Sequence, residues 1–133
     1  MKTASIRYLG ELRTECTHLS SGTKIITDAP LDNHGKAEAF SPTDLVATSL
    51  ASCVMTIMGI YCQTHGITFN SAEASIEKHM ASDPRRVAKI VLDMDLSGNH
   101  WDELTKKKVI AAGKACPVAR TLEGNVVLEL NIH

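Results

Sequence analysis

The segment from Phe40 to Gly66 constrains the fold more than any other part of this 133-residue chain. It is the longest stretch of low charge, and Asp44 is its only formally charged residue. Ser41, Pro42 and Asp44 form a helix-start signal, because a serine with an acid three residues later makes a capping box and a proline suits the first helical position. Gly66 is suited to ending the helix. Such a helix is about 35 Å long, which is large for a chain of this size.

The predicted helix, Pro42–His65, is apolar around most of its circumference, which favours a buried position. A membrane span is the alternative, but serine, threonine and glutamine residues interrupt the run and no basic residues flank it. We therefore expect the central helix of a compact core. Because so short a chain cannot cover this helix alone, we also expect a homodimer with the helix at the interface.

The composition limits the classes of partner. With 133 residues and 44% hydrophobic content, the chain is expected to form one domain over residues 1–133. A net charge of −1 argues against nucleic acid or an anionic membrane as partner, and 4% aromatic residues argue against a surface that stacks bases. The first residues contain no signal-peptide pattern, so we expect a cytoplasmic protein with reduced thiols. The cysteine and histidine spacings match no zinc site, and we expect neither a metal nor a cofactor.

Strands and shorter helices are predicted on both sides of the long helix. The expected strands are residues 5–9, 12–18, 24–27, 72–80, 87–96 and 126–132, and the expected short helices are residues 101–115 and 117–122. Asn99 or His100 is expected to begin the first of these helices, and the lysines at 106–108 are expected to form a solvated face. This order predicts an α+β fold with helices on one face of an antiparallel sheet.

The four cysteines differ in their predicted surroundings. Cys53 lies in the third turn of the long helix and could be a small core residue or a functional thiol. Cys116 precedes Pro117 at a helix start, where the helix dipole favours the thiolate. Cys16, in a strand, and Cys62, near the end of the long helix, are expected to be passive. A thiol among apolar residues resists ionisation, so a reactive Cys53 would need a nearby cation.

Two motifs carry a resemblance to a known family. The first is S-P-T-D-L-V-A-T-S-L-A-S-C, Ser41–Cys53, and the second is A-C-P-V-A-R-T-L, Ala115–Leu122. Together, at this separation, they resemble the OsmC/Ohr family of osmotically inducible and organic hydroperoxide resistance proteins. The resemblance extends over essentially the whole chain. The opening segment and the loop T-D-A-P-L-D-N-H-G-K are most similar to the OsmC-like branch of that family.

The resemblance implies a fold, an assembly and an activity. The implied fold has antiparallel sheets packed on a long central helix, in an intertwined homodimer. The implied activity is the thiol-dependent reduction of organic hydroperoxides in oxidative stress defence, with a dithiol reductant, for example of the lipoyl type. By resemblance, Cys53 attacks the peroxide and Cys116 resolves the sulfenic acid to a disulfide. Arg13 is the implied cation that stabilises the departing alkoxide.

The chain departs from the pattern of the family's peroxidases at two positions. Those peroxidases hold the arginine with a glutamate ten residues before the first cysteine, where this chain has Thr43. The neighbouring Asp44 is therefore a candidate anchor as well as a helix cap. Arg13 also lies outside a Gly-Gly-Arg-like turn, and Arg120 is the alternative cation. A redox-sensing or small-ligand-binding protein without efficient peroxidase turnover remains the alternative function.

Overall fold

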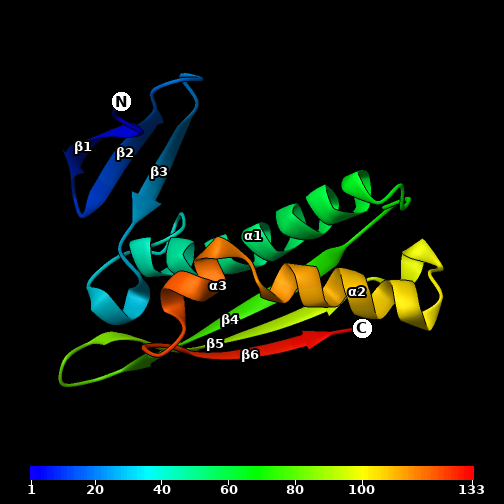
Figure 1. Cartoon of the computed structure of the whole chain (residues 1–133). Helices are drawn as coiled ribbons and strands as arrows, with labels where there is room; N and C mark the ends of the chain where they lie inside the picture. Colours follow the sequence, from blue (N-terminus) through cyan, green and yellow to red (C-terminus); the bar gives the residue numbers. More distant parts are fainter. The chain divides into compact units, whose positions relative to one another are not determined.

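The computed structural model describes residues 1–133 and contains two compact units, Met1–Val46 and Ala47–His133 (Figure 1). The first unit carries three strands and the first residues of the long helix. The second unit carries the rest of that helix, three more strands and two shorter helices. The fold is α+β, as expected, and the arrangement of all 133 residues as one domain stays a prediction.

The first unit contains an antiparallel sheet in the order β1-β2-β3. Its strands are β1 (Ala4–Gly10), β2 (Arg13–His18) and β3 (Lys24–Asp28), so the predicted meander is confirmed. Glu11 and Leu12 form the turn between β1 and β2, and both have positive φ angles, 53° and 65°. The Tyr8 hydroxyl accepts a hydrogen bond from the Leu12 N–H at 3.2 Å and so supports this turn. A short 3-10 helix, η1 (Leu31–Asn33), lies in the loop that follows β3.

The long helix α1 (Pro42–Thr64) begins where its capping box predicts. The Ser41 N–H donates to Asp44 Oδ2 at 2.9 Å, and the Asp44 N–H donates to Ser41 Oγ at 3.0 Å. At the other end, Gly66 takes a positive φ of 66°, and the Ile67 N–H donates to the Cys62 carbonyl at 2.9 Å. Both predicted ends of the helix are therefore confirmed by the bonds that close them.

One stripe of α1 faces the core of the second unit. Its buried residues are Ala47, Leu50, Val54, Met58 and Cys62. By length and composition alone α1 could cross a membrane, but a core helix passes the same test. The buried stripe packs with strand residues, as expected for the core helix. The opposite side is not covered by this single chain, because Val46 and Ile60 are exposed.

The sheet of the second unit corrects one prediction. It has the order β4-β5-β6, with β4 (Glu73–Ala81), β5 (Arg86–Asp95) and β6 (Val127–Ile132). The β4–β5 pair is antiparallel, but β5 and β6 are parallel, so the expectation of a purely antiparallel sheet is wrong. The reason is that α2 (Glu103–Lys114) and α3 (Pro117–Leu122) lie between β5 and β6 in the chain. A long crossover of this kind can return the chain to run parallel to its starting strand.

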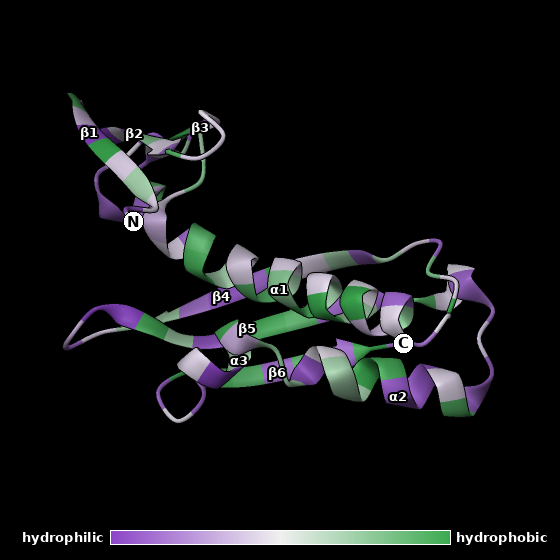
Figure 2. Cartoon of the chain, turned by 45° about the horizontal axis from the view of Figure 1, so that its top comes forward, coloured by the Kyte–Doolittle hydropathy of each residue, from purple (hydrophilic) through white to green (hydrophobic).

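Alternation along β5 turns one face of this sheet toward the helices. Ile90, Leu92 and Met94 alternate in β5 and are buried, together with residues of α1 and with Val109 of α2. Both helices lie over this face in two views (Figures 1 and 2). The expected packing of helices on one sheet face therefore holds within the second unit.

The start of α2 corrects a second prediction. Asp102, not Asn99 or His100, caps the helix, and its carboxylate accepts the Thr105 N–H at 2.7 Å. Asn99 lies in the 3-10 helix η2 (Ser97–Asn99) and is buried. Its side chain hydrogen-bonds the main chain of residues 70, 71 and 96. An asparagine in a turn can bond distant main-chain groups as readily as cap a helix, and here it does so.

Candidate active site

The second unit brings the thiols of Cys53 and Cys116 together. Cys53 lies midway along α1 and is partly exposed, whereas Cys116 is 0% exposed. Cys53 packs against the core cluster that contains Cys116, and it is near enough to raise the pKa of the Cys116 thiol. The two cysteine motifs, far apart in sequence, therefore meet at one place.

The local sequence around Cys116 explains how it is held. Pro117 occupies the first turn of α3, and Cys116 is the N-cap with an extended backbone, φ −67° and ψ 155°. Its sulfur accepts the Ala119 N–H at 3.4 Å. Helix α2 approaches α1 closely at Gly113, where an added Cβ would lie 2.8 to 3.0 Å from Met58 and Val54. The absence of a side chain at Gly113 thus permits the approach that brings Cys116 to α1.

Opposing effects act on the ionisation of Cys116. Burial raises the pKa of the Cys116 thiol and is the largest effect, whereas the hydrogen bond from the Ala119 N–H lowers it. The neighbouring Cys53 side chain raises it further. The prediction that the helix start would favour the Cys116 thiolate is therefore wrong, because desolvation outweighs the N-cap hydrogen bond.

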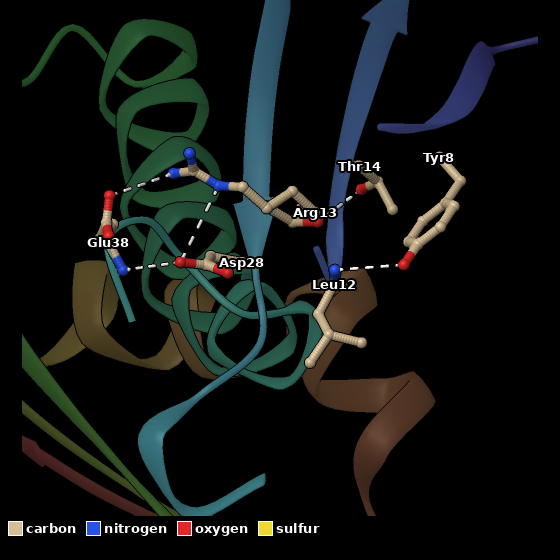
Figure 3. A network of polar contacts seen from close by, with 7 residues as sticks. Tyr8, Leu12, Arg13, Thr14, Asp28 and Glu38 are labelled. Carbon is tan, nitrogen blue, oxygen red and sulfur yellow. Dashed lines mark hydrogen bonds and ion pairs between the residues drawn. The ribbon is translucent and has the colours of Figure 1, made fainter. Parts of the chain in front are cut away.

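Arg13 lies in the first unit, at the start of β2, between two carboxylates (Figure 3). Its Nε atom is 3.9 Å from Asp28 Oδ2, and its Nη2 atom is 3.9 Å from Glu38 Oε2. Asp28 is 1% exposed, whereas the side chain of Glu38 is 57% exposed. The arginine therefore has one buried and one solvated ionic partner.

Asp44 takes the capping role that the sequence predicts for it, and its role as an arginine anchor stays a prediction. The carboxylates beside Arg13, Asp28 and Glu38, were not predicted from the sequence. A signal for Asp28 did exist, because the predicted turn after β2 implies a pairing register. Counting outward from Ser20 and Ser21 places residue 13 opposite residue 28, as observed.

The remaining candidates lie in less specific surroundings. Cys16 is partly buried in β2, with its sulfur 3.8 Å from Thr14 Oγ1. Cys62 is 1% exposed, and burial raises the pKa of its thiol. Arg120, the alternative cation, forms an exposed ion pair with Glu123 at 3.5 Å. All four cysteines are free thiols.

An α+β chain with two small sheets, a long helix and a pair of adjoining thiols defines a recognisable class of protein. The sequence profile of OsmC-like proteins matches residues 34–131, which is well over half of the chain. The chain therefore belongs to the OsmC-like protein family. Among curated proteins, no significant match is found.

Solved structures agree with this assignment. A protein of Psychrobacter arcticus 273-4, provisionally described as an osmotic stress induced and detoxification response protein, is 44% identical. It matches with a TM-score of 0.93 over 100% of this chain and 96% of that one. An OsmC-like protein of Mycoplasma pneumoniae is 18% identical, with a TM-score of 0.81 over 100% and 96% of the two chains. The organic hydroperoxide resistance protein OsmC of Legionella pneumophila is 17% identical, with a TM-score of 0.76 over 99% and 97%.

Proposed function

We propose that this protein reduces organic hydroperoxides with Cys53 and Cys116. The Cys53 thiolate bonds to one peroxide oxygen, the O–O bond breaks, and the alkoxide leaves and takes up a proton to become an alcohol. Cys53 is then a sulfenic acid. The Cys116 thiol condenses with it, which forms a disulfide and releases water, and a dithiol reductant restores both thiols.

The closeness of the two cysteine side chains is the observation that carries this proposal. A disulfide requires two sulfur atoms that can meet without a large backbone movement, and the packing of the two cysteines in one cluster supports this. Exposure supports the division of roles. A peroxide arriving from solvent can reach the partly exposed Cys53, whereas Cys116 is 0% exposed. The name of the Legionella pneumophila relative refers to organic hydroperoxides and supports this substrate class.

We further propose that Arg13 assists the attack, with the role that the family resemblance implies. A departing alkoxide needs a positive charge and N–H donors, and a guanidinium supplies both. Asp44 belongs to the proposed machinery as the cap that fixes the start of α1. The free thiols require a reducing compartment, so the proposed setting is the cytoplasm.

The test is consumption of cumene hydroperoxide in the presence of dithiothreitol. We expect turnover by the wild type and none by Cys53→Ser. Cys116→Ser should form the Cys53 sulfenic acid without the disulfide, and Cys16→Ser should behave as wild type. Peptide mapping after one equivalent of peroxide should find a single Cys53–Cys116 bridge. A bridge to Cys16 or Cys62 would refute the assignment, and Cys53 oxidation without turnover would favour the redox-sensing alternative.

We also propose that the protein is a homodimer, since each unit leaves apolar surface uncovered. Ile6, Cys16 and Ile25 lie opposite one another across the first sheet and therefore share a face. Ile6 and Ile25 are 63% and 47% exposed, which is typical of a surface that binds a partner. A second copy would cover this face and the outward side of α1.

Sedimentation at micromolar concentration tests the dimer. The wild type should sediment as a dimer, and Ile6→Lys should shift the population toward the monomer. Ser5→Lys is the matched control, because neighbouring residues of a strand point to opposite faces. A monomeric wild type, or equal effects of the two substitutions, would contradict the proposal.

A further inference from the structure

Asp28 is a buried carboxylate beside Arg13. β2 and β3 pair in a register that places Arg13 directly opposite Asp28, so both side chains lie on one face of the sheet. Asp28 is 1% exposed, although a carboxylate is rarely buried unless it is paired or hydrogen-bonded. The groups that Asp28 contacts therefore indicate its role in the structure.

Asp28 has two kinds of partner, and both constrain Arg13. Its Oδ2 atom lies 3.9 Å from Arg13 Nε and also accepts the Glu38 N–H at 3.0 Å. The main-chain N–H of Asp28 donates to the Phe40 carbonyl at 3.0 Å. Asp28 thus connects β3 to residues 38 and 40 of the loop that separates β3 from α1. Figure 3 shows its contact with Glu38.

The loop itself is folded closely at this neck. The Ala37 N–H donates to the Ala29 carbonyl at 3.1 Å, and the Gly35 N–H donates to the Pro30 carbonyl at 2.9 Å. A Cβ at Gly35 would lie 1.7 Å from the Ala29 oxygen, so only glycine fits there. The closed neck brings the Glu38 carboxylate to 3.9 Å from Arg13 Nη2. Asp28 therefore positions the arginine directly and also through Glu38.

The contacts hold the arginine without using its donors. Both carboxylates lie 3.9 Å from the guanidinium nitrogens, which is beyond hydrogen-bond distance. The Nε atom is buried and has no hydrogen-bond partner. A guanidinium held by charge alone has N–H groups that are not committed to its carboxylate partners. This is the state required of a group that must donate to a departing alkoxide.

We propose that Asp28 is the positioning residue for Arg13 in hydroperoxide reduction. The inference rests on the proposed function, and in particular on the role of Arg13. Glu38 contributes less than Asp28 to holding Arg13 in position, because exposed ion pairs contribute little free energy. The proposal thus assigns the arginine anchor to β3, in place of the glutamate that the family's peroxidases carry on the long helix.

The experiment uses Asp28→Asn, which removes the charge but keeps an oxygen that can accept the Glu38 N–H. We expect it to slow the oxidation of Cys53 by cumene hydroperoxide at least about tenfold, because small displacements of a reacting group are costly in rate. Glu38→Gln should slow it less than about threefold. Glu15→Gln is the matched control, since Glu15 also pairs with cations on this sheet, at 3.3 Å from Arg7 and 3.4 Å from Lys24, and it should leave the rate unchanged.

Two further measurements separate positioning from a structural role. In an Arg13→Ala background, Asp28→Asn should change the oxidation rate less than about twofold, because the residue acts through the arginine. Alkylation of Cys53 by iodoacetamide releases iodide and no alkoxide. Above about pH 10, where an ordinary thiol ionises without a cation, Asp28→Asn should therefore change the alkylation rate less than about twofold. Equal slowing by Asp28→Asn in both backgrounds, or slowing of the high-pH alkylation as large as that of the peroxide reaction, would show a structural role and overturn the inference.

The outcome also distinguishes this inference from the proposed function. An active wild type that is slowed by Arg13→Ala but not by Asp28→Asn overturns the inference and leaves the function in place. An active wild type that Arg13→Ala does not slow overturns the inference and the role of Arg13, but not the thiol pair. A wild type that consumes no hydroperoxide overturns the function and, with it, this role of Asp28.

Discussion

Gly113→Ala should loosen the packing that brings the two thiols together. Gly113 lies in α2, one turn before Cys116, and an added Cβ would lie 2.8 Å from Met58 Cε, 2.9 Å from Met58 Cγ and 3.0 Å from Val54 Cγ1. Met58 and Val54 are both 0% exposed, so neither has free space to move into. On α1, Val54 directly follows Cys53 in sequence, and Met58 lies about one turn further along the helix. A displacement of α2 would therefore act where the thiols meet.

The magnitude follows from two opposing effects. Replacing glycine by alanine inside a helix favours folding by about 1 kcal/mol, because the unfolded chain loses freedom. Adding a methyl group to a filled core costs about 1–3 kcal/mol. We expect overpacking to win, with a net loss of about 1 kcal/mol for Gly113→Ala. Gly59→Ala in α1 is the matched control, because its Cβ would meet only Phe69 at 3.9 Å, and it should gain about 0.5–1 kcal/mol.

Urea unfolding at one fixed protein concentration measures this difference, which should be about 2 kcal/mol between the two variants. The second assay is the rate at which the Cys53 sulfenic acid forms its disulfide with Cys116. This rate should fall in Gly113→Ala and stay at the wild-type value in Gly59→Ala. If both glycine substitutions stabilised the protein equally, α2 would not be in contact with α1 at Gly113.

Two further predictions concern pH and a buried amide. Because burial raises the pKa of Cys116, its contribution to stability is fully present below the pKa of the unfolded thiol, about 8.5, and is lost as pH rises through the folded-state pKa. The free energy of unfolding of the wild type, relative to Cys116→Ser, should therefore fall above about pH 8.5, and a flat difference would contradict this. Asn99→Ala should lower the free energy of unfolding by about 2–4 kcal/mol, because it leaves the Asn70 and Ser71 N–H groups without their Oδ1 acceptor at 2.7 and 3.1 Å. Asn99→Asp keeps that acceptor and should lose less in the same urea measurement.

The positions of the helices and strands could be predicted well from local sequence signals. Features that depend on residues far apart in the sequence were harder to predict. The ends of α1 follow from Ser41, Asp44 and Gly66, because capping depends on neighbours three or four residues away. The parallel pairing of β5 and β6 depends on the path of the intervening helices, which no local pattern specifies. The cap of α2 was misplaced because asparagine and aspartate both suit an N-cap.

In the candidate site, too, the residues within one motif could be predicted, whereas contacts between distant segments could not. The thiols were identified from their motifs, yet their proximity depends on helix packing at Gly113. Asp28 was missed because it was assigned to no element, while the register that places it opposite Arg13 is a property of the paired strands. The two partners of Arg13 come from different segments, β3 and the following loop. Such pairs can be predicted only when the pairing register of two strands is used to work out which side chains lie opposite each other.

The environments of the two thiols give them different chemistry, although both are cysteines. Burial raises the pKa of the Cys116 thiol, because the N-cap hydrogen bond from Ala119 does not compensate for lost hydration. A 0% exposed thiol with a raised pKa competes poorly for peroxide, since the thiolate is the nucleophile. It can still condense with a sulfenic acid that forms next to it. The proposed order of attack thus follows from solvent access and desolvation, and exchanging the two environments would exchange the two roles.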